Sequence, residues 1–126
     1  MLGISVFLFS FIVPETEKVE LGIASFYHSK FNGRKTSSGE IFSNKNLTAA
    51  HKKLPIGTWV KVTNLKNDSS IIVRINDRLP SRSKRIIDLS HRAAQQLNFI
   101  RAGLAKVKIE VLTPVRDSLM NEISFK

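Results

Sequence analysis

Apolar and polar side chains alternate over several short stretches of the chain, which is the period of a β-strand with one buried face. In residues 105–112, for example, Val107, Ile109 and Val111 share one face, and Lys106, Lys108 and Glu110 share the other. The same period predicts strands over residues 19–27, 58–64 and 71–76. A shorter apolar run predicts a fifth strand over residues 85–89.

The segments between these strands carry turn and helix signals. Residues 31–46 are rich in Gly, Ser, Thr and Asn and predict a long loop, and residues 67–70 predict a hairpin turn. Ser90 is a good N-cap for a short helix over residues 91–97, and Asn98 suits the left-handed position that ends one. Five or so strands with one short helix predict an all-β domain closed into a barrel, since closure leaves no exposed strand edge.

The two ends of the chain differ from this pattern. Leu2–Val13 is apolar except for one glycine and two serines, and as a helix it would extend about 18 Å. That is shorter than the roughly 30 Å core of a bilayer, so we expect no stable membrane span. The length fits the apolar part of an export signal, although no basic residue precedes it; a buried element of the domain is the alternative. We expect a signal-like segment and linker over residues 1–18, a domain over 19–113 and a tail over 114–126.

Charge and cysteine content restrict the partners. The chain has 20 Lys and Arg against 10 Asp and Glu, a formal net charge of +10, and no cysteine. Such a charge favours polyanions, including anionic cell-wall polymers, although solubility alone would also account for it. The basic residues are scattered and no nucleic-acid motif accompanies them, so nucleic acid is not expected. Three dispersed histidines without cysteine predict no metal site and no cofactor. We expect a monomer.

Three carboxylates remain as candidates for chemistry once those in the termini, the hairpin turn and an exposed strand face are set aside. Asp77 ends a strand and enters a loop, where a rigid scaffold can hold it in a cleft; an ion pair with a nearby arginine is the alternative. Asp88 precedes a helix start, which favours local capping. Glu40 follows Gly39 in a polar loop and is either a groove residue or solvated surface.

Among the histidines, His51 stands out because it lies in an apolar stretch, where an imidazole needs a partner. The alternative is a buried histidine with a purely structural role, whose ring nitrogens form hydrogen bonds within the core. His28 ends a strand and His91 lies on the surface of the short helix.

Seven motifs occur in an order that resembles the rare lipoprotein A family of lytic transglycosylases. They are GIASFY (22–27), TSSGE (36–40), LTAAH (47–51), LPIGT (54–58), VKVTN (60–64), VRINDR (73–78) and IDLS (87–90). The resemblance covers about residues 21–112 and implies a six-stranded double-psi β-barrel, the fold that expansins share. It implies a catalytic role for Asp77 and His51 and a substrate-binding role for Glu40, Tyr27, Arg78 and Thr48.

One departure from the family pattern bears on the active loop. Leu79 stands where the family usually has glycine after Asp-Arg. If that position requires a positive φ, leucine strains the loop that carries Asp77, and Leu79→Gly should stabilise the domain or raise its activity.

The family's reaction needs a single acid. A hydrolytic glycosidase usually needs two carboxylates, whereas in a lytic transglycosylase the muramic acid C6 hydroxyl attacks C1 and closes a 1,6-anhydro ring. Asp77 would protonate the leaving oxygen, and His51 would hydrogen-bond Asp77 or the substrate. Burial would raise the pKa of Asp77 and nearby arginines would lower it.

We therefore expect an endolytic enzyme of the periplasm, cell envelope or secreted fraction that acts on peptidoglycan. Two alternatives stay open. One is a non-catalytic, expansin-like module that grips glycan with aromatic residues such as Phe26, Tyr27 and Trp59. The other is a structural barrel that recruits division or wall-synthesis proteins.

Overall fold

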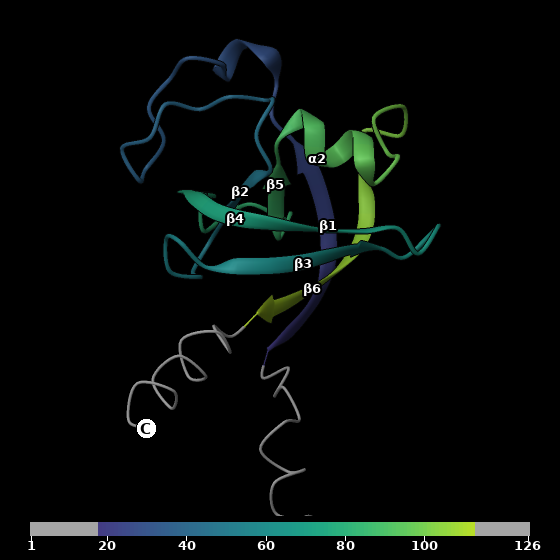
Figure 1. Ribbon diagram of the computed structural model, residues 1–126. Helices are drawn as coiled ribbons and strands as arrows, with labels where there is room; N and C mark the ends of the chain where they lie inside the picture. Colours follow the sequence, from purple (N-terminus) through teal and green to yellow (C-terminus); the bar gives the residue numbers. More distant parts are fainter. Residues whose placement is uncertain (1–17, 113–126) are drawn as a thin grey trace, which may run out of the picture.

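The computed structural model describes residues 18–112, which form a closed barrel of six strands with one short α-helix (Figure 1). The strands follow one another around the barrel in the order β1-β5-β2-β4-β3-β6. The elements are β1 (Val19–Phe26), the 3-10 helix η1 (Ser29–Phe31), β2 (Thr48–His51), β3 (Trp59–Asn64), β4 (Ser70–Arg78), β5 (Ile87–Leu89), α2 (His91–Gln96) and β6 (Ala105–Leu112).

The barrel mixes parallel and antiparallel pairs. β1 lies parallel to β5, and β2 lies parallel to β4, while the remaining four pairs are antiparallel. The expected hairpin is confirmed: β3 pairs with β4 from Trp59↔Arg74 to Thr63↔Ser70. Its turn contains Asp68 with φ at 59°, a conformation that a short polar side chain tolerates.

The core lies inside the barrel and under α2. Alternate residues of the paired strands fill it, including Val60, Val62, Val73, Ile75 and Ile109, each at most 1% exposed. The helix begins as the sequence predicts, since the Ser90 hydroxyl accepts a hydrogen bond from the Ala93 N–H. The predicted left-handed stop is also confirmed, because Asn98 has φ at 58°. All-β architecture with one short helix is therefore correct.

Two features of the barrel differ from the alternation read in the sequence. The sequence pattern does not predict strand β2. All four of its residues are buried, so both of its faces are covered and the residues do not alternate between apolar and polar. In β1 the larger apolar residues face outward: Leu21 is 65% exposed, whereas Ala24 is fully buried. Small residues face inward here because the neighbouring elements come close; a Cβ on Gly22 would meet Ile86 Cγ2 at 2.6 Å.

Candidate active site

The site is built on a row of side chains that crosses four adjacent strands on the outside of the barrel. Ala50 of β2 is the register partner of Asp77 on β4 and of Asp88 on β5, and Asp88 is the partner of Ser25 on β1. Register partners present their side chains on the same face of a sheet. Asp77 and Asp88 therefore flank buried Ala50 on one surface.

A β-bulge in β4 places Asp77 on this surface. The register between β2 and β4 shifts between Ala49↔Ile75 and Ala50↔Asp77, which leaves Asn76 as an extra residue. Ile75 and Asn76 are consequently both buried, and Asp77 turns to the side that Arg74 also occupies. A bulge re-aims a side chain in this way at many functional sites.

Neutral donors hold the carboxylate of Asp77. The Tyr27 hydroxyl donates to Oδ2, and the backbone N–H groups of Ser37 and Arg78 each donate to Oδ1 at 2.9 Å. Burial raises the pKa of Asp77, but these hydrogen bonds outweigh it and leave the pKa below its ordinary value. Arginine side chains were expected to cause such lowering; that expectation is wrong, because within residues 18–112 Asp77 forms no ion pair.

Tyr27 is fixed on both sides of this contact. Its ring stacks on Phe42 with centroids 4.3 Å apart and lies edge-on to Phe31. Burial, followed by the hydrogen bond to Asp77 and its charge, raises the pKa of Tyr27 strongly, so the hydroxyl keeps its proton. Tyr27 therefore positions Asp77, whereas the sequence predicts a substrate contact for it.

Glu40 lies beside Asp77 but is engaged by arginine. Arg74 Nη1 and Nη2 donate to its two carboxylate oxygens at 2.7 and 2.5 Å, and the Ser38 hydroxyl donates at 3.0 Å. The bidentate hydrogen bonds from Arg74 lower the pKa of Glu40. The turn that carries Glu40 also supplies the Ser37 N–H to Asp77, so both carboxylates are anchored to one loop.

Asp88, on the other side of Ala50, is engaged in the same manner. Arg85 donates from Nε at 2.8 Å and from Nη2 at 3.0 Å, and the Ser25 hydroxyl donates at 2.5 Å. The sequence predicts helix capping for Asp88, and that is wrong because Ser90 and Asn44 accept the hydrogen bonds from the first N–H groups of α2. The contact of Asp88 with Ser25 instead ties β5 to β1.

His51 lies on the opposite face of β2 from Asp77. Successive residues of a strand point to opposite sides, so the neighbour of Ala50 turns inward, toward the end of the barrel. There its Nδ1 accepts hydrogen bonds from the N–H groups of Lys53 and Leu54, both at 3.0 Å, and Nε2 lies 2.7 Å from Glu20 Oε1. Because Nδ1 accepts, the proton is on Nε2 and points to Glu20. The expected direct hydrogen bond to Asp77 is absent within the described residues.

Arg78 and Thr48, both expected to bind substrate, differ in exposure: Arg78 is exposed and Thr48 is buried. Arg78 Nη1 donates to the carbonyls of Leu54 at 2.7 Å and His51 at 3.3 Å. Thr48 is 5% exposed, and its hydroxyl oxygen has no hydrogen-bond partner among residues 18–112.

Leu79 does not strain the loop. Among the described non-glycine residues, positive φ occurs at Asp68 and Asn98, so Leu79 has an ordinary backbone conformation. Its side chain is buried at 5% exposure, and its N–H donates to the carbonyl of His51 at 3.2 Å. The positive φ on which the strain hypothesis depends is therefore absent, and the loop packs around leucine.

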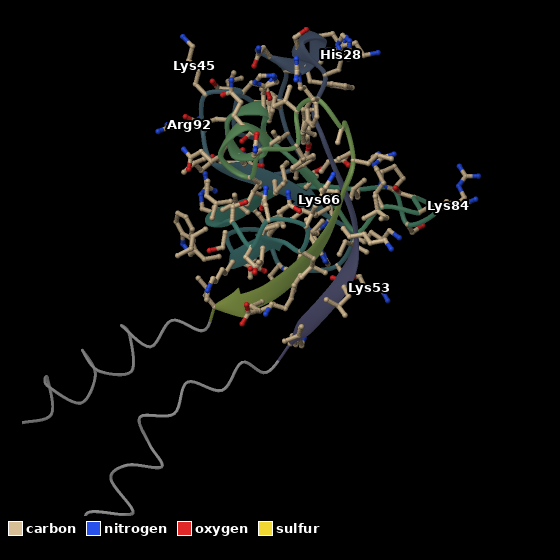
Figure 2. All side chains as sticks on the ribbon, turned by 90° about the vertical axis from the view of Figure 1, so that its right-hand side faces the viewer. His28, Lys45, Lys53, Lys66, Lys84 and Arg92 are labelled. Atoms are coloured by element: carbon tan, nitrogen blue, oxygen red, sulfur yellow. The ribbon has the colours of Figure 1, made fainter. Side chains whose placement is uncertain are left out.

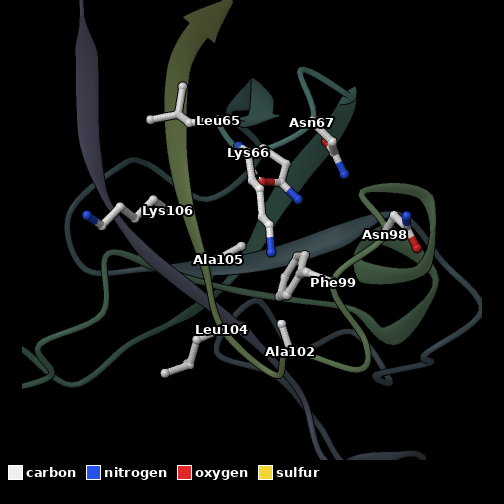
Figure 3. Close-up of a pocket in the computed structure, with 10 residues that line it drawn as sticks. Leu65, Lys66, Asn67, Asn98, Phe99, Ala102, Leu104, Ala105 and Lys106 are labelled. Atoms are coloured by element: carbon white, nitrogen blue, oxygen red, sulfur yellow. Dashed lines mark hydrogen bonds between the residues drawn. The ribbon is translucent and has the colours of Figure 1, made fainter.

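Two hollows of the surface lie away from the carboxylate row. One of about 430 Å³ lies at the barrel end beside Glu20, His51 and Leu54. The other, of about 620 Å³, lies between the β3–β4 turn and the residues that follow α2 (Figure 3), where Lys66, Phe99 and Leu104 line it. Neither of these two hollows is lined by Asp77, Glu40 or Asp88.

The positive charge is spread around the barrel. Figure 2 shows Lys45, Lys53, Lys66 and Lys84 projecting from different sides of the molecule. Within residues 18–112, no three His, Asp or Glu side chains gather as a metal site requires. No helix in the same part of the chain is long and apolar enough to cross a membrane.

Four residues around the site were not identified from the sequence: Ser37, Arg85, Ser25 and Glu20. The partners of Ser37, Ser25 and Glu20 lie 31 to 63 residues away in sequence, and only the fold brings these pairs together. Arg85 is different, because it contacts Asp88 only three residues along the chain. Glu20 was set aside as lying at the domain edge, and the edge is where the barrel end closes over His51.

The fold has close structural relatives among double-psi β-barrels. A papain inhibitor from Streptomyces superposes with a TM-score of 0.63 at 20% identity, covering 77% of this chain and 96% of the inhibitor. An expansin from Clavibacter michiganensis superposes with a TM-score of 0.60 at 18% identity, covering 77% of this chain and 52% of the expansin. These likenesses define the chain as a double-psi β-barrel protein.

Sequence comparison gives the family. A family described as lytic transglycolase matches residues 19–109. The endolytic peptidoglycan transglycosylase RlpA of Haemophilus influenzae is 53% identical over 94 residues, which are 75% of this chain and 33% of that protein. The RlpA of Neisseria meningitidis is 53% identical over 98 residues, 78% of this chain and 41% of that protein. The chain belongs to the rare lipoprotein A-type family of lytic transglycosylase domains, and it spans about a third of the length of these curated relatives.

Proposed function

We propose that this domain cleaves the glycan strands of peptidoglycan as an endolytic lytic transglycosylase, with Asp77 as its acid and base. One observation carries the proposal. Of the three candidate carboxylates, Glu40 and Asp88 are each held by both nitrogens of an arginine fork, whereas neutral donors hold Asp77. Asp77 alone among the three can take up a proton without breaking an ion pair.

The lytic reaction fits this arrangement because it needs one proton carrier. The C6 hydroxyl of muramic acid attacks C1, the bond from C1 to the glycosidic oxygen breaks, and the hydroxyl proton ends on the leaving sugar. One carboxyl group can give a proton to the leaving oxygen and take one from the C6 hydroxyl, so no second carboxylate is required to activate water. A glycan strand laid over the row would exclude water from Asp77 and raise its pKa from the low value of the free protein.

His51 enters the proposal as a positioning residue. Both of its ring nitrogens form hydrogen bonds: Nε2 with Glu20, and Nδ1 with the backbone N–H groups of the turn formed by residues 51–54. That turn offers the Leu54 carbonyl to Arg78, and the Arg78 N–H donates to Asp77. His51 thus acts on Asp77 through the backbone of the turn and through Arg78.

The names of the relatives support a place for this domain at the cell wall. We propose that residues 1–18 direct export, that residues 19–113 form a monomeric catalytic domain, and that peptidoglycan in the periplasm or envelope is its substrate. Fractionation of cells that express the tagged chain tests this localisation. A pool of protein confined to the cytoplasm would contradict it.

Digestion of purified sacculi followed by mass spectrometry tests the function. The expected result is release of soluble fragments that end in 1,6-anhydromuramic acid. Sacculi that retain the protein by sedimentation but release no fragments would instead favour the expansin-like, non-cutting alternative. Fragments with reducing ends would mean hydrolysis and would require a second carboxylate.

A further inference from the structure

Three aromatic side chains were expected to be able to stack on sugars, and the structure leaves one of them open. The ring of Tyr27 is covered by Phe42, and that of Phe26 packs edge-on against His91 and Phe99. Trp59 is 50% exposed and makes no aromatic or cation contact among residues 18–112. A half-exposed indole on a sheet surface is suited to stacking on a flat, partly apolar ligand.

Trp59 lies on the same outer face as the carboxylate row but is displaced from it along β4. Trp59 is the register partner of Arg74, so the two side chains leave the barrel on the same face, with Cβ atoms about 5 Å apart. Arg74 precedes Asp77 on β4, and its partner on β2 is Thr48 rather than Ala50. Arg74 holds Glu40, whose turn donates to Asp77. Trp59 is therefore linked to the row through Arg74 and Glu40, and Figure 1 shows β3 and β4 side by side.

A polymer that is cut in its interior must be held on both sides of the cleaved bond. Near Trp59 the exposed side chains are Ile56 at 40% exposure, Ile72 at 49% exposure, and Lys61, the register partner of Ile72. Sugar rings present a face of C–H groups that stacks on indole, and exposed apolar side chains beside a binding surface commonly mark its extension.

We propose that Trp59 is a sugar-stacking subsite that binds the glycan strand to one side of the bond cleaved at Asp77. This rests on the proposed function for the identity of the polymer. The ligand of this subsite is the sugar backbone of the glycan strand. The peptide stems of peptidoglycan are the alternative ligand, and the experiment below distinguishes the two.

Trp59 is the single tryptophan of the chain, so its fluorescence reports its own surroundings. The probe is a set of glycan strands stripped of stem peptides, titrated into the full chain carrying Asp77→Asn to prevent turnover. The expected result is a saturable change of emission together with protection from acrylamide quenching. Isolated stem peptides should leave the emission unchanged. A response to the peptides and none to the glycan would overturn the proposal.

Variants give a second readout that does not depend on fluorescence. In the Asp77→Asn background, Trp59→Ala should weaken sedimentation with sacculi by on the order of tenfold, and Trp59→Phe should restore most of it. Leu104→Ala is the matched control, because Leu104 is 55% exposed but lies at the hollow of Figure 3. Equal binding by Trp59→Ala and Leu104→Ala would overturn the subsite.

The two proposals fail separately. If the wild type releases no anhydro fragments while Trp59 responds to glycan, the subsite stands and the cutting activity falls. If anhydro fragments form while the emission of Trp59 stays constant at saturating glycan, the activity stands and the subsite falls.

Discussion

Different polar groups lie on the two sides of the barrel wall at strand β2. On the outer face, Ala50 separates Asp77 of β4 from Asp88 of β5, and both aspartates are partly exposed. On the inner face, His51 is 5% exposed and is enclosed by Glu20 and the 51–54 turn. The sequence motif places His51 and Asp77 together as a catalytic pair, but strand alternation separates their side chains.

This difference divides the roles at the site. A group on the open face can touch a polymer and exchange protons with it, whereas a buried imidazole with both nitrogens occupied holds the chain in place. The same contrast holds along the outer face, where arginine fixes Glu40 and Asp88 and leaves Asp77 able to titrate. Experiments that exchange these roles test the division.

The largest effect is expected when the two aspartates beside Ala50 are compared. Asp77→Asn keeps the shape of the side chain but removes the proton carrier, so turnover should fall by about 10² to 10⁴-fold with the fold retained. Asp88→Asn should instead lower stability, because Arg85 and Ser25 lose a charged partner, and should retain most of the turnover. Fragment release from sacculi and urea unfolding of both variants give the comparison. Equal loss of turnover in the two would contradict the division.

Leu79→Gly is expected to destabilise the domain by about 3 kcal/mol, since it removes a buried side chain and adds backbone freedom. Leu104→Gly is a control at an exposed position outside the regular strands. Chemical denaturation measures both free energies of unfolding. A more stable Leu79→Gly variant would mean that the loop requires glycine after all.

Two substitutions of His51 separate its two contacts. Asn can place an oxygen near the site of Nδ1 and accept from the 53 and 54 N–H groups, whereas Gln reaches toward Glu20 and leaves those N–H groups without an acceptor. An unsatisfied buried donor costs roughly 1–3 kcal/mol, so His51→Gln should lose more stability and turnover than His51→Asn. If only His51→Gln were active, the contact with Glu20 would be the important one.

The smallest of these effects is a shift in pH dependence. Tyr27→Phe removes one of the hydrogen bonds that lower the pKa of Asp77 and keeps the ring on Phe42, so the pKa should rise. If the free protein must carry the proton, kcat/KM falls as pH rises through this pKa, and the falling limb should move to higher pH in the variant. An unmoved limb would show that another group sets the profile.

The acid stability of the domain depends on the same group. A carboxyl whose pKa is lowered by folding stabilises the protein above its ordinary value, 3.8 for Asp77, and this contribution is lost as pH falls through the folded value. Tyr27→Phe should therefore lose less stability on acidification than the wild type does. Melting temperatures across the acid range measure the difference.

Much of this structure could be predicted from local pattern. Strands β3, β4 and β6 have one buried face, so their alternation is visible, and the Ser90 cap and Asn98 stop depend on neighbours in sequence. The fully buried β2 has no alternation to read. In the middle of β1 the inward residues are the small Gly22 and Ala24, whereas Leu21 faces outward, which reverses the apparent apolar side.

The sequence predicts which residues form the site better than it predicts how they are arranged. Motif order identified Asp77, Glu40 and Tyr27, which the structure brings together, but not that Tyr27 and two backbone N–H groups hold the aspartate. The bulge at Asn76 decides which face Asp77 occupies, and nothing in a single sequence marks it. Likewise, the pairing of His51 with Glu20 depends on how the barrel closes.

The central claim is that one carboxylate acts here without water as a nucleophile, and digestion of sacculi in water enriched in heavy oxygen tests it most directly. In a lytic reaction the new end forms from the C6 hydroxyl, so the released fragments should carry no heavy oxygen at C1. Incorporation of heavy oxygen at C1 would show hydrolysis and contradict the account, and Asp88, across Ala50 from Asp77, or Glu40 would then have to leave its arginine and serve as the second carboxylate.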